Sequence, residues 1–232
     1  DKKPDSIPES DLPSAYPAEM RETPLPEGLE TGLIQISIPE FENEVWAYVP
    51  KDYDPGRQYA AVIWLHAPGQ FDRDATLEKW QPLCDQNDMI LILPKSRNDQ
   101  WQQTDIELFQ KVLDDVAGRY SVDMNRVTAH GHLAGGTIAY LLAFRNRDTI
   151  RGVATVDAPV VGRPPANAPD QPLDFFIAAS QSGTGQRVRG VIAPLRKMNY
   201  AVTEIDIGPA SRYLNDKELK QLTRWIDSLD KL

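Results

Sequence analysis

The chain has 232 residues, 41% of them hydrophobic, which is enough for one complete core and does not require a second domain. Its formal net charge of −9 argues against a broad surface for nucleic acid or anionic membranes, because such surfaces need clustered Lys and Arg. No apolar run reaches the roughly 18 residues of a membrane span. Composition therefore predicts one soluble domain; the compartment stays open, with an extracytoplasmic one slightly favoured.

Residues 1–30 differ in composition from the rest of the chain. They hold six of the 19 prolines and eight acidic residues against three basic ones. Proline favours extended polyproline geometry and like charges repel, so we expect a linker or arm that tethers the domain to an upstream one or lies on its surface. A disordered tail accounts for the same composition equally well.

From residue 31 the sequence alternates between strand-like and helix-like segments. Residues 33–38 and 45–49 predict two antiparallel strands at a sheet edge. Six short apolar runs without strict alternation then indicate strands buried on both faces, as in a parallel sheet. These runs are residues 59–65, 89–93, 127–130, 152–156, 173–179 and 201–207.

Helical periods separate these strands. Apolar residues share one face over residues 106–120, over 188–195 and over 219–229, and Asn215 with Glu218 gives the last of these helices a capping signal. Short connections between alternating strands and helices imply right-handed crossovers. The predicted fold class is α/β, a mostly parallel, doubly wound sheet of about eight strands with flanking helices.

The most informative motif is Gly131-His132-Leu133-Ala134-Gly135, which follows a predicted strand and precedes a predicted helix. It has the spacing of a nucleophile elbow, a sharp turn that needs glycine on both sides because the helix packs close to the strand. Leucine stands at the position of the nucleophile.

With this motif the chain resembles the α/β-hydrolase superfamily, and within it the group of small carboxylesterases, feruloyl esterases and polyhydroxybutyrate-depolymerase-like proteins. The resemblance covers residues 31–232 and implies the α/β-hydrolase fold without a lid domain. It rests on the elbow and on three further stretches, Trp46-Ala47-Tyr48-Val49-Pro50, Val62-Ile63-Trp64-Leu65-His66, and Tyr120-Ser121-Val122-Asp123 with Arg126-Val127.

The resemblance also implies where an oxyanion hole would lie. One backbone N–H would come from the loop His66-Ala67-Pro68, and the second from Ala134, the residue after the nucleophile position. Pro68 has no N–H, so we expect this loop to offer one donor fewer than its counterparts.

The acid and the base of a triad would follow the last two strands, in the chain order nucleophile, acid, histidine. The resemblance puts the acid at or next to Gly183, in the segment that begins at Ser180, and the histidine at Ser211, which precedes Arg212. All three triad positions would then be substituted. The chain has three histidines, and none lies after His132.

Other chemistry-bearing residues are more simply explained by structure. His66, His130 and His132 lack a carboxylate at ligand spacing, so we expect neither a metal site nor a cofactor. Cys84 is expected to be a buried cysteine in a helix over residues 77–86, Asp157 a turn former that could still line a pocket, and Ser180, Ser182 and Ser211 turn serines. Trp101 is the tryptophan best placed to line a pocket, although capping or packing is the simpler expectation for it as well.

Three hypotheses follow. The leading one is a catalytically inactive hydrolase-like domain kept for binding or scaffolding, with a small apolar or ester-like ligand, because Leu133 has no lone pair with which to attack a carbonyl. The second is an active carboxylesterase or related serine hydrolase that uses relocated residues. The third is a structural domain without a ligand; an open cleft beside Leu133 would argue against it.

Overall fold

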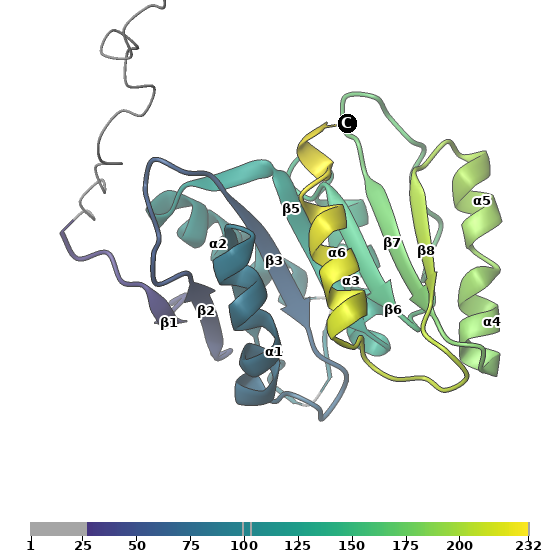
Figure 1. Cartoon of the computed structure of the whole chain (residues 1–232), viewed down its shortest axis with the longest axis horizontal. Helices are drawn as coiled ribbons and strands as arrows, with labels where there is room; N and C mark the ends of the chain where they lie inside the picture. Colours follow the sequence, from purple (N-terminus) through teal and green to yellow (C-terminus); the bar gives the residue numbers. More distant parts are fainter. Residues whose placement is uncertain (1–26, 99, 103, 232) are drawn as a thin grey trace, which may run out of the picture.

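The computed structural model describes residues 27–231, apart from residues 99 and 103, and shows one eight-stranded sheet with helices on both faces (Figure 1). The strands are β1 (Gly32–Ile36), β2 (Val45–Val49), β3 (Tyr59–Leu65), β4 (Met89–Pro94), β5 (Val122–His132), β6 (Gly152–Val156), β7 (Asp174–Ala179) and β8 (Val202–Asp206). The helices are α1 (Arg73–Gln86), α2 (Asp105–Arg119), α3 (Ala134–Arg145), α4 (Gly183–Arg189), α5 (Ile192–Lys197) and α6 (Asp216–Ile226).

The strand order is β1-β2-β4-β3-β5-β6-β7-β8. The pairs β1–β2 and β2–β4 are antiparallel, and every other pair is parallel. This confirms the predicted doubly wound sheet and its two antiparallel edge strands. The carboxyl ends of β3, β5, β6 and β7 therefore meet at one edge, which is where open α/β sheets place their ligand sites.

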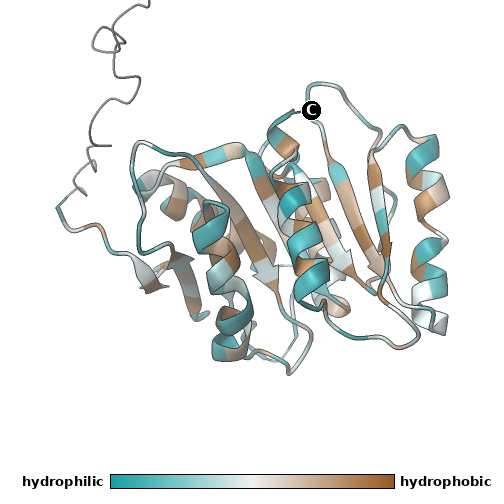
Figure 2. Ribbon diagram, viewed as in Figure 1, coloured by the Kyte–Doolittle hydropathy of each residue, from teal (hydrophilic) through white to brown (hydrophobic). Residues whose placement is uncertain are grey.

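Two apolar layers hold the helices to the sheet. One lies between the sheet and α2, α3, α4 and α5, and the other between the sheet and α1 and α6. Every residue of β3, β4 and β6 is buried, which explains why their sequences do not alternate. Figure 2 shows hydrophobic colour on the strands of the sheet, while α1 and α6 turn hydrophilic surfaces outward.

The helix predictions hold with one correction. At the start of α6, Asn215 Oδ1 accepts from the Glu218 N–H at 3.0 Å and Glu218 Oε2 from the Asn215 N–H at 2.8 Å, so the capping box is present. The continuous helical period expected over residues 188–195 is wrong, because α4 ends at Arg189 and α5 begins at Ile192. Pro194 has no N–H to donate to the Gly190 carbonyl, so the helix is interrupted there.

The predicted arm falls mostly on residues 1–26, outside the described residues. Among the helices that are described, none is both long and apolar enough to cross a membrane.

Candidate functional site

The turn between β5 and α3 has the backbone of a nucleophile elbow. Leu133 has φ 51° and ψ −122°, and its N–H donates to the Val156 carbonyl of β6 at 2.9 Å. A positive φ is costly for a residue with a branched side chain, on the order of 1–3 kcal/mol. The turn is thus held in its strained form with leucine at its apex.

The glycines around Leu133 are required by close approach. A Cβ on Gly135 would lie 2.0 Å from the Leu65 carbonyl oxygen, and one on Gly131 would lie 2.4 Å from the Gly135 carbonyl carbon. One on Gly136 would lie 2.4 Å from Cβ of Ala158. These contacts press α3 against the ends of β3 and β5, which explains why glycine is needed at these positions whatever residue stands at the apex of the turn.

The strain at the elbow can be measured by two substitutions that both remove the leucine side chain. We expect Leu133→Gly to be more stable than Leu133→Ala by about 1 kcal/mol, because only glycine adopts a positive φ without penalty. Urea unfolding of the two variants measures the difference. If alanine were equal or better, the elbow would not be strained in solution.

The loop after β3, where the sequence analysis expects an oxyanion-hole donor, is fixed by hydrogen bonds of His66. Its Nε2 accepts the Ser96 N–H at 3.1 Å, so Nδ1 carries the proton and donates to the Ala67 carbonyl at 2.7 Å. Trp101 Nε1 donates to the His66 carbonyl at 2.8 Å. His66 is thus a buried structural residue that shapes the loop.

A cavity of about 180 Å³ lies where this loop meets the start of α3. Trp101, the tryptophan that the sequence placed best for a pocket but for which capping or packing was the simpler expectation, lines it. Its lining comes from the loop after β3, from the loop between β4 and α2, and from α3. The lining residues are Pro68, Gln100, Trp101, Ala134, Thr137 and Ile138.

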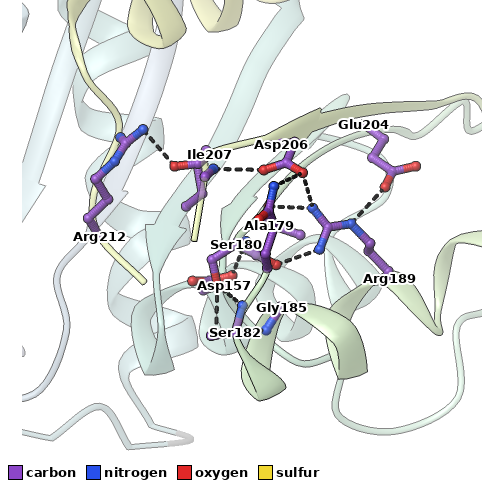
Figure 3. Close-up of polar contacts among 12 residues, drawn as sticks. Asp157, Ala179, Ser180, Ser182, Gly185, Arg189, Glu204, Asp206, Ile207 and Arg212 are labelled. Carbon is purple, nitrogen blue, oxygen red and sulfur yellow. Dashed lines mark hydrogen bonds and ion pairs between the residues drawn. The ribbon is translucent and has the colours of Figure 1, made fainter. Parts of the chain in front are cut away.

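Asp157, directly after β6, is more than a turn former. Its side chain is fully buried, its φ is 46°, and its Oδ1 accepts the Ser180 N–H at the end of β7 at 2.8 Å (Figure 3). Its Oδ2 is buried and has no hydrogen-bond partner among the described residues. The sequence gives Asp157 as a pocket candidate, and the structure joins it to Ser180.

The segment after β7 holds Ser180, Ser182 and Gly183. The hydroxyls of Ser180 and Ser182 are 2.7 Å apart, and Ser182 Oγ accepts the Gly185 N–H at 3.3 Å to cap α4. Gly183 is exposed, and a Cβ there would meet nothing within 4 Å. The serines therefore bond locally, as turn serines do.

Arg189 links the carboxyl ends of β7 and β8 by hydrogen bonds and ion pairs. Arg189 donates to the Ala179 and Ser180 carbonyls and pairs with Glu204 and Asp206 at 3.2 Å each (Figure 3). No sequence motif marks this cluster, because Arg189 lies 9 or more residues from each of its partners.

Arg212 holds the loop after β8 in place by hydrogen bonds to a carboxylate and to a backbone carbonyl. It donates to both carboxylate oxygens of Glu218, at 2.7 and 2.8 Å, and to the Ile207 carbonyl at 2.7 Å. The Arg212 guanidinium lowers the pKa of Glu218. Ser211, the expected histidine position, is exposed on this loop. The loops after β7 and β8 adjoin, because the Gln181 N–H donates to the Gly208 carbonyl at 2.8 Å.

His130 belongs to a buried network that the sequence did not reveal. Its Nδ1 donates to the Ala154 carbonyl at 2.9 Å, and its Nε2 accepts from the Tyr213 hydroxyl at 2.8 Å. That hydroxyl also accepts from Trp80 Nε1 at 3.0 Å. Burial lowers the pKa of His130 to about 3, so the imidazole is neutral.

The remaining sequence candidates lie away from any reactive arrangement. Cys84 is buried in α1, as predicted, and burial raises the pKa of its thiol. Within the described residues, no three or more His, Cys, Asp or Glu side chains gather as metal ligands would.

No family profile matches the sequence, and no curated protein resembles it in sequence. Solved structures do match. An S-formylglutathione hydrolase from Staphylococcus aureus has a TM-score of 0.63 at 12% identity, over 84% of this chain and 97% of that one. A ferulic acid esterase from Anaeromyces mucronatus has a TM-score of 0.64 at 17% identity, over 94% and 95%.

A fluorophosphonate-binding serine hydrolase from Staphylococcus aureus has a TM-score of 0.65 at 13% identity, over 84% of this chain and 96% of that one. At such identities a likeness shows the fold and leaves the chemistry of each site to its own residues. With its strand order and its elbow, the chain has the α/β-hydrolase fold seen in these esterases.

Proposed function

We propose that this domain binds a small apolar or ester-like ligand beside the elbow and does not perform covalent acyl transfer. The observation that carries the proposal is Leu133 at the apex of the elbow, where a hydrolase of this fold needs a nucleophile. A leucine side chain has no lone pair, so no activation by a neighbouring base can make it attack a carbonyl.

The positions of the other triad members support the same reading. Gly183 and Ser211 carry neither a carboxylate nor an imidazole, and His66 and His130 are held by backbone carbonyls and other partners. The cavity beside Ala134 supports binding over a purely structural role, because it offers apolar walls and a tryptophan face.

Catalysis is tested with short p-nitrophenyl esters and a fluorophosphonate probe. We expect neither turnover above the buffer rate nor labelling. Labelling of one serine, or clear turnover, would instead establish the competing hypothesis of a hydrolase with relocated residues.

The assigned triad positions are tested by rebuilding them. We expect the triple variant Leu133→Ser, Gly183→Asp and Ser211→His to gain measurable esterase activity, because the backbone of the elbow is already in place and Gly183 has room for a side chain. The matched control is the single variant Leu133→Ser, which should remain at least tenfold slower because it has no base. A folded triple variant without activity would show that the positions are assigned wrongly.

Binding is tested by following the Trp101 indole N–H in NMR spectra during addition of p-nitrophenyl butyrate. We expect the signal to shift, and the shift to be lost in Ala134→Leu, where the larger side chain narrows the cavity. Gln86→Leu is the matched control, because Gln86 is exposed and lines a different groove between α1 and α6. Equal shifts in all three proteins would place the ligand elsewhere.

A further inference from the structure

Two buried polar atoms beneath the elbow have no hydrogen-bond partner in the part of the chain that the structure describes. They are Nε2 of His132, at the end of β5, and Oδ2 of Asp157, just after β6. A buried polar atom without a hydrogen bond costs about 1–3 kcal/mol, and two such atoms are rarely left unsatisfied in one place.

The sheet brings these two residues to the carboxyl ends of two neighbouring strands, β5 and β6. His132 pairs with Val156 in the register of β5 and β6, and Asp157 is the next residue along the chain. No hydrogen bond or ion pair among the described residues joins the two side chains directly. Two buried polar groups that lie at the ends of neighbouring strands and make no direct bond can be bridged by a buried water.

The charge of Asp157 acts on His132 nonetheless. Burial lowers the pKa of the His132 imidazole, and the Asp157 carboxylate opposes this by raising it. The other titratable groups that face the ring are Tyr213, with ring centroids 6.0 Å apart, and His130, whose pKa a charge on His132 would lower. Asp157 is the one carboxylate that these contacts place against His132.

We infer that His132 and Asp157 hold one buried water molecule between Nε2 and Oδ2 and form a water-linked acid–base pair beneath the elbow. The carboxylate stays anchored by the Ser180 N–H on its other oxygen, and the imidazole remains partly exposed beside Leu133. The pair takes a small ligand that can both donate and accept hydrogen bonds, which water does. It gives the elbow a titrating group that no triad position supplies.

NMR titration of the three histidines tests the electrostatic link. Asp157→Asn should lower the titration midpoint of His132 by about one pH unit, since it removes the charge that favours the imidazolium. Asparagine tolerates the positive φ of Asp157 and can keep the Ser180 bond, so the variant should fold. Asp170→Asn, at an exposed turn, is the matched control and should leave the midpoint unchanged. The His132 signal is assigned with His132→Gln.

Crystallography of the wild-type protein tests the bridge itself and does not depend on any variant. We expect one ordered water within hydrogen-bond distance of both His132 Nε2 and Asp157 Oδ2. The inference is overturned if no water reaches both atoms, or if the His132 midpoint is the same in Asp157→Asn as in the wild type.

Discussion

Gly135→Ala should destabilise the protein by about 3 kcal/mol or more, or prevent folding, because its Cβ would lie 2.0 Å from the backbone oxygen of Leu65. One side of this contact is the end of β3, in the middle of the sheet, and the other side is the first turn of α3. Neither β3 nor α3 can move without disturbing the core between them. Urea unfolding, or the yield of folded protein where the variant does not fold, measures the loss.

Gly183→Ala is the matched control for this prediction. A Cβ on Gly183 meets nothing within 4 Å, and alanine favours the first turn of a helix over glycine, so the change should be neutral or slightly stabilising. Equal losses in the two variants would contradict the view that close approach at the elbow, rather than glycine content, makes Gly135 necessary.

Much of the fold could be predicted from the sequence because the burial of a strand produces a recognisable pattern of apolar residues. Strands such as β3 and β4 are covered on both faces and read as continuous apolar runs. The elbow could be found because its glycines are required by the close packing of α3 on the strands, which does not depend on whether the turn carries a nucleophile. The split between α4 and α5 was missed, since the apolar spacing of residues 188–195 continues across the break that Pro194 causes.

The site was less predictable, because its polar partners come from distant parts of the chain. Sequence spacing singled out Asp157, Ser180 and Ser211, but it could not show that Asp157 bonds to Ser180 across neighbouring strands. Nor could it show that Tyr213 hydrogen-bonds to His130. Such partners are set by strand register and loop packing, which a single sequence does not encode locally.

The three assigned triad positions remain predictions, and the structure adds a physical consideration to each. Leu133 has the right backbone for a nucleophile, and Gly183 has space for an acid. Ser211 lies on a loop that the hydrogen bonds between Arg212 and Glu218 hold in place. A histidine at position 211 would therefore stand on a backbone that is already fixed. We therefore expect that the triad can be rebuilt by exchanging side chains, without a large change of the backbone.

The second large effect concerns pH and His130. Its pKa is about 3 in the folded protein and about 6.5 in an unfolded chain, so between these values the unfolded state binds more protons. The stability that neutral His130 contributes is therefore complete above pH 6.5 and falls as the pH drops toward 3. The expected loss is about 1.4 kcal/mol for each pH unit, or about 2 kcal/mol between pH 7 and pH 5.

Other groups titrate in the same range with different signs, so the effect must be read as a difference between variants. Burial raises the pKa of Asp174 to about 6, which makes the folded state gain stability as the pH falls through that value. Burial also lowers the pKa of His132, so His132, like His130, makes the folded state less stable as the pH falls. The contribution of Asp174 does not change when only His130 is replaced, and that of His132 changes little because His130 is neutral between pH 5 and pH 7.

His130→Gln removes the titrating group while an amide can still bond to the Ala154 carbonyl and the Tyr213 hydroxyl. The variant should be less stable than the wild type at pH 7, and its deficit should shrink by about 2 kcal/mol at pH 5. Tyr213→Phe is the control: it loses a hydrogen bond to the same ring but leaves the histidine buried, so its deficit should change much less with pH. Urea unfolding at both pH values measures these differences, and a constant deficit in His130→Gln would mean that the buried imidazole titrates normally.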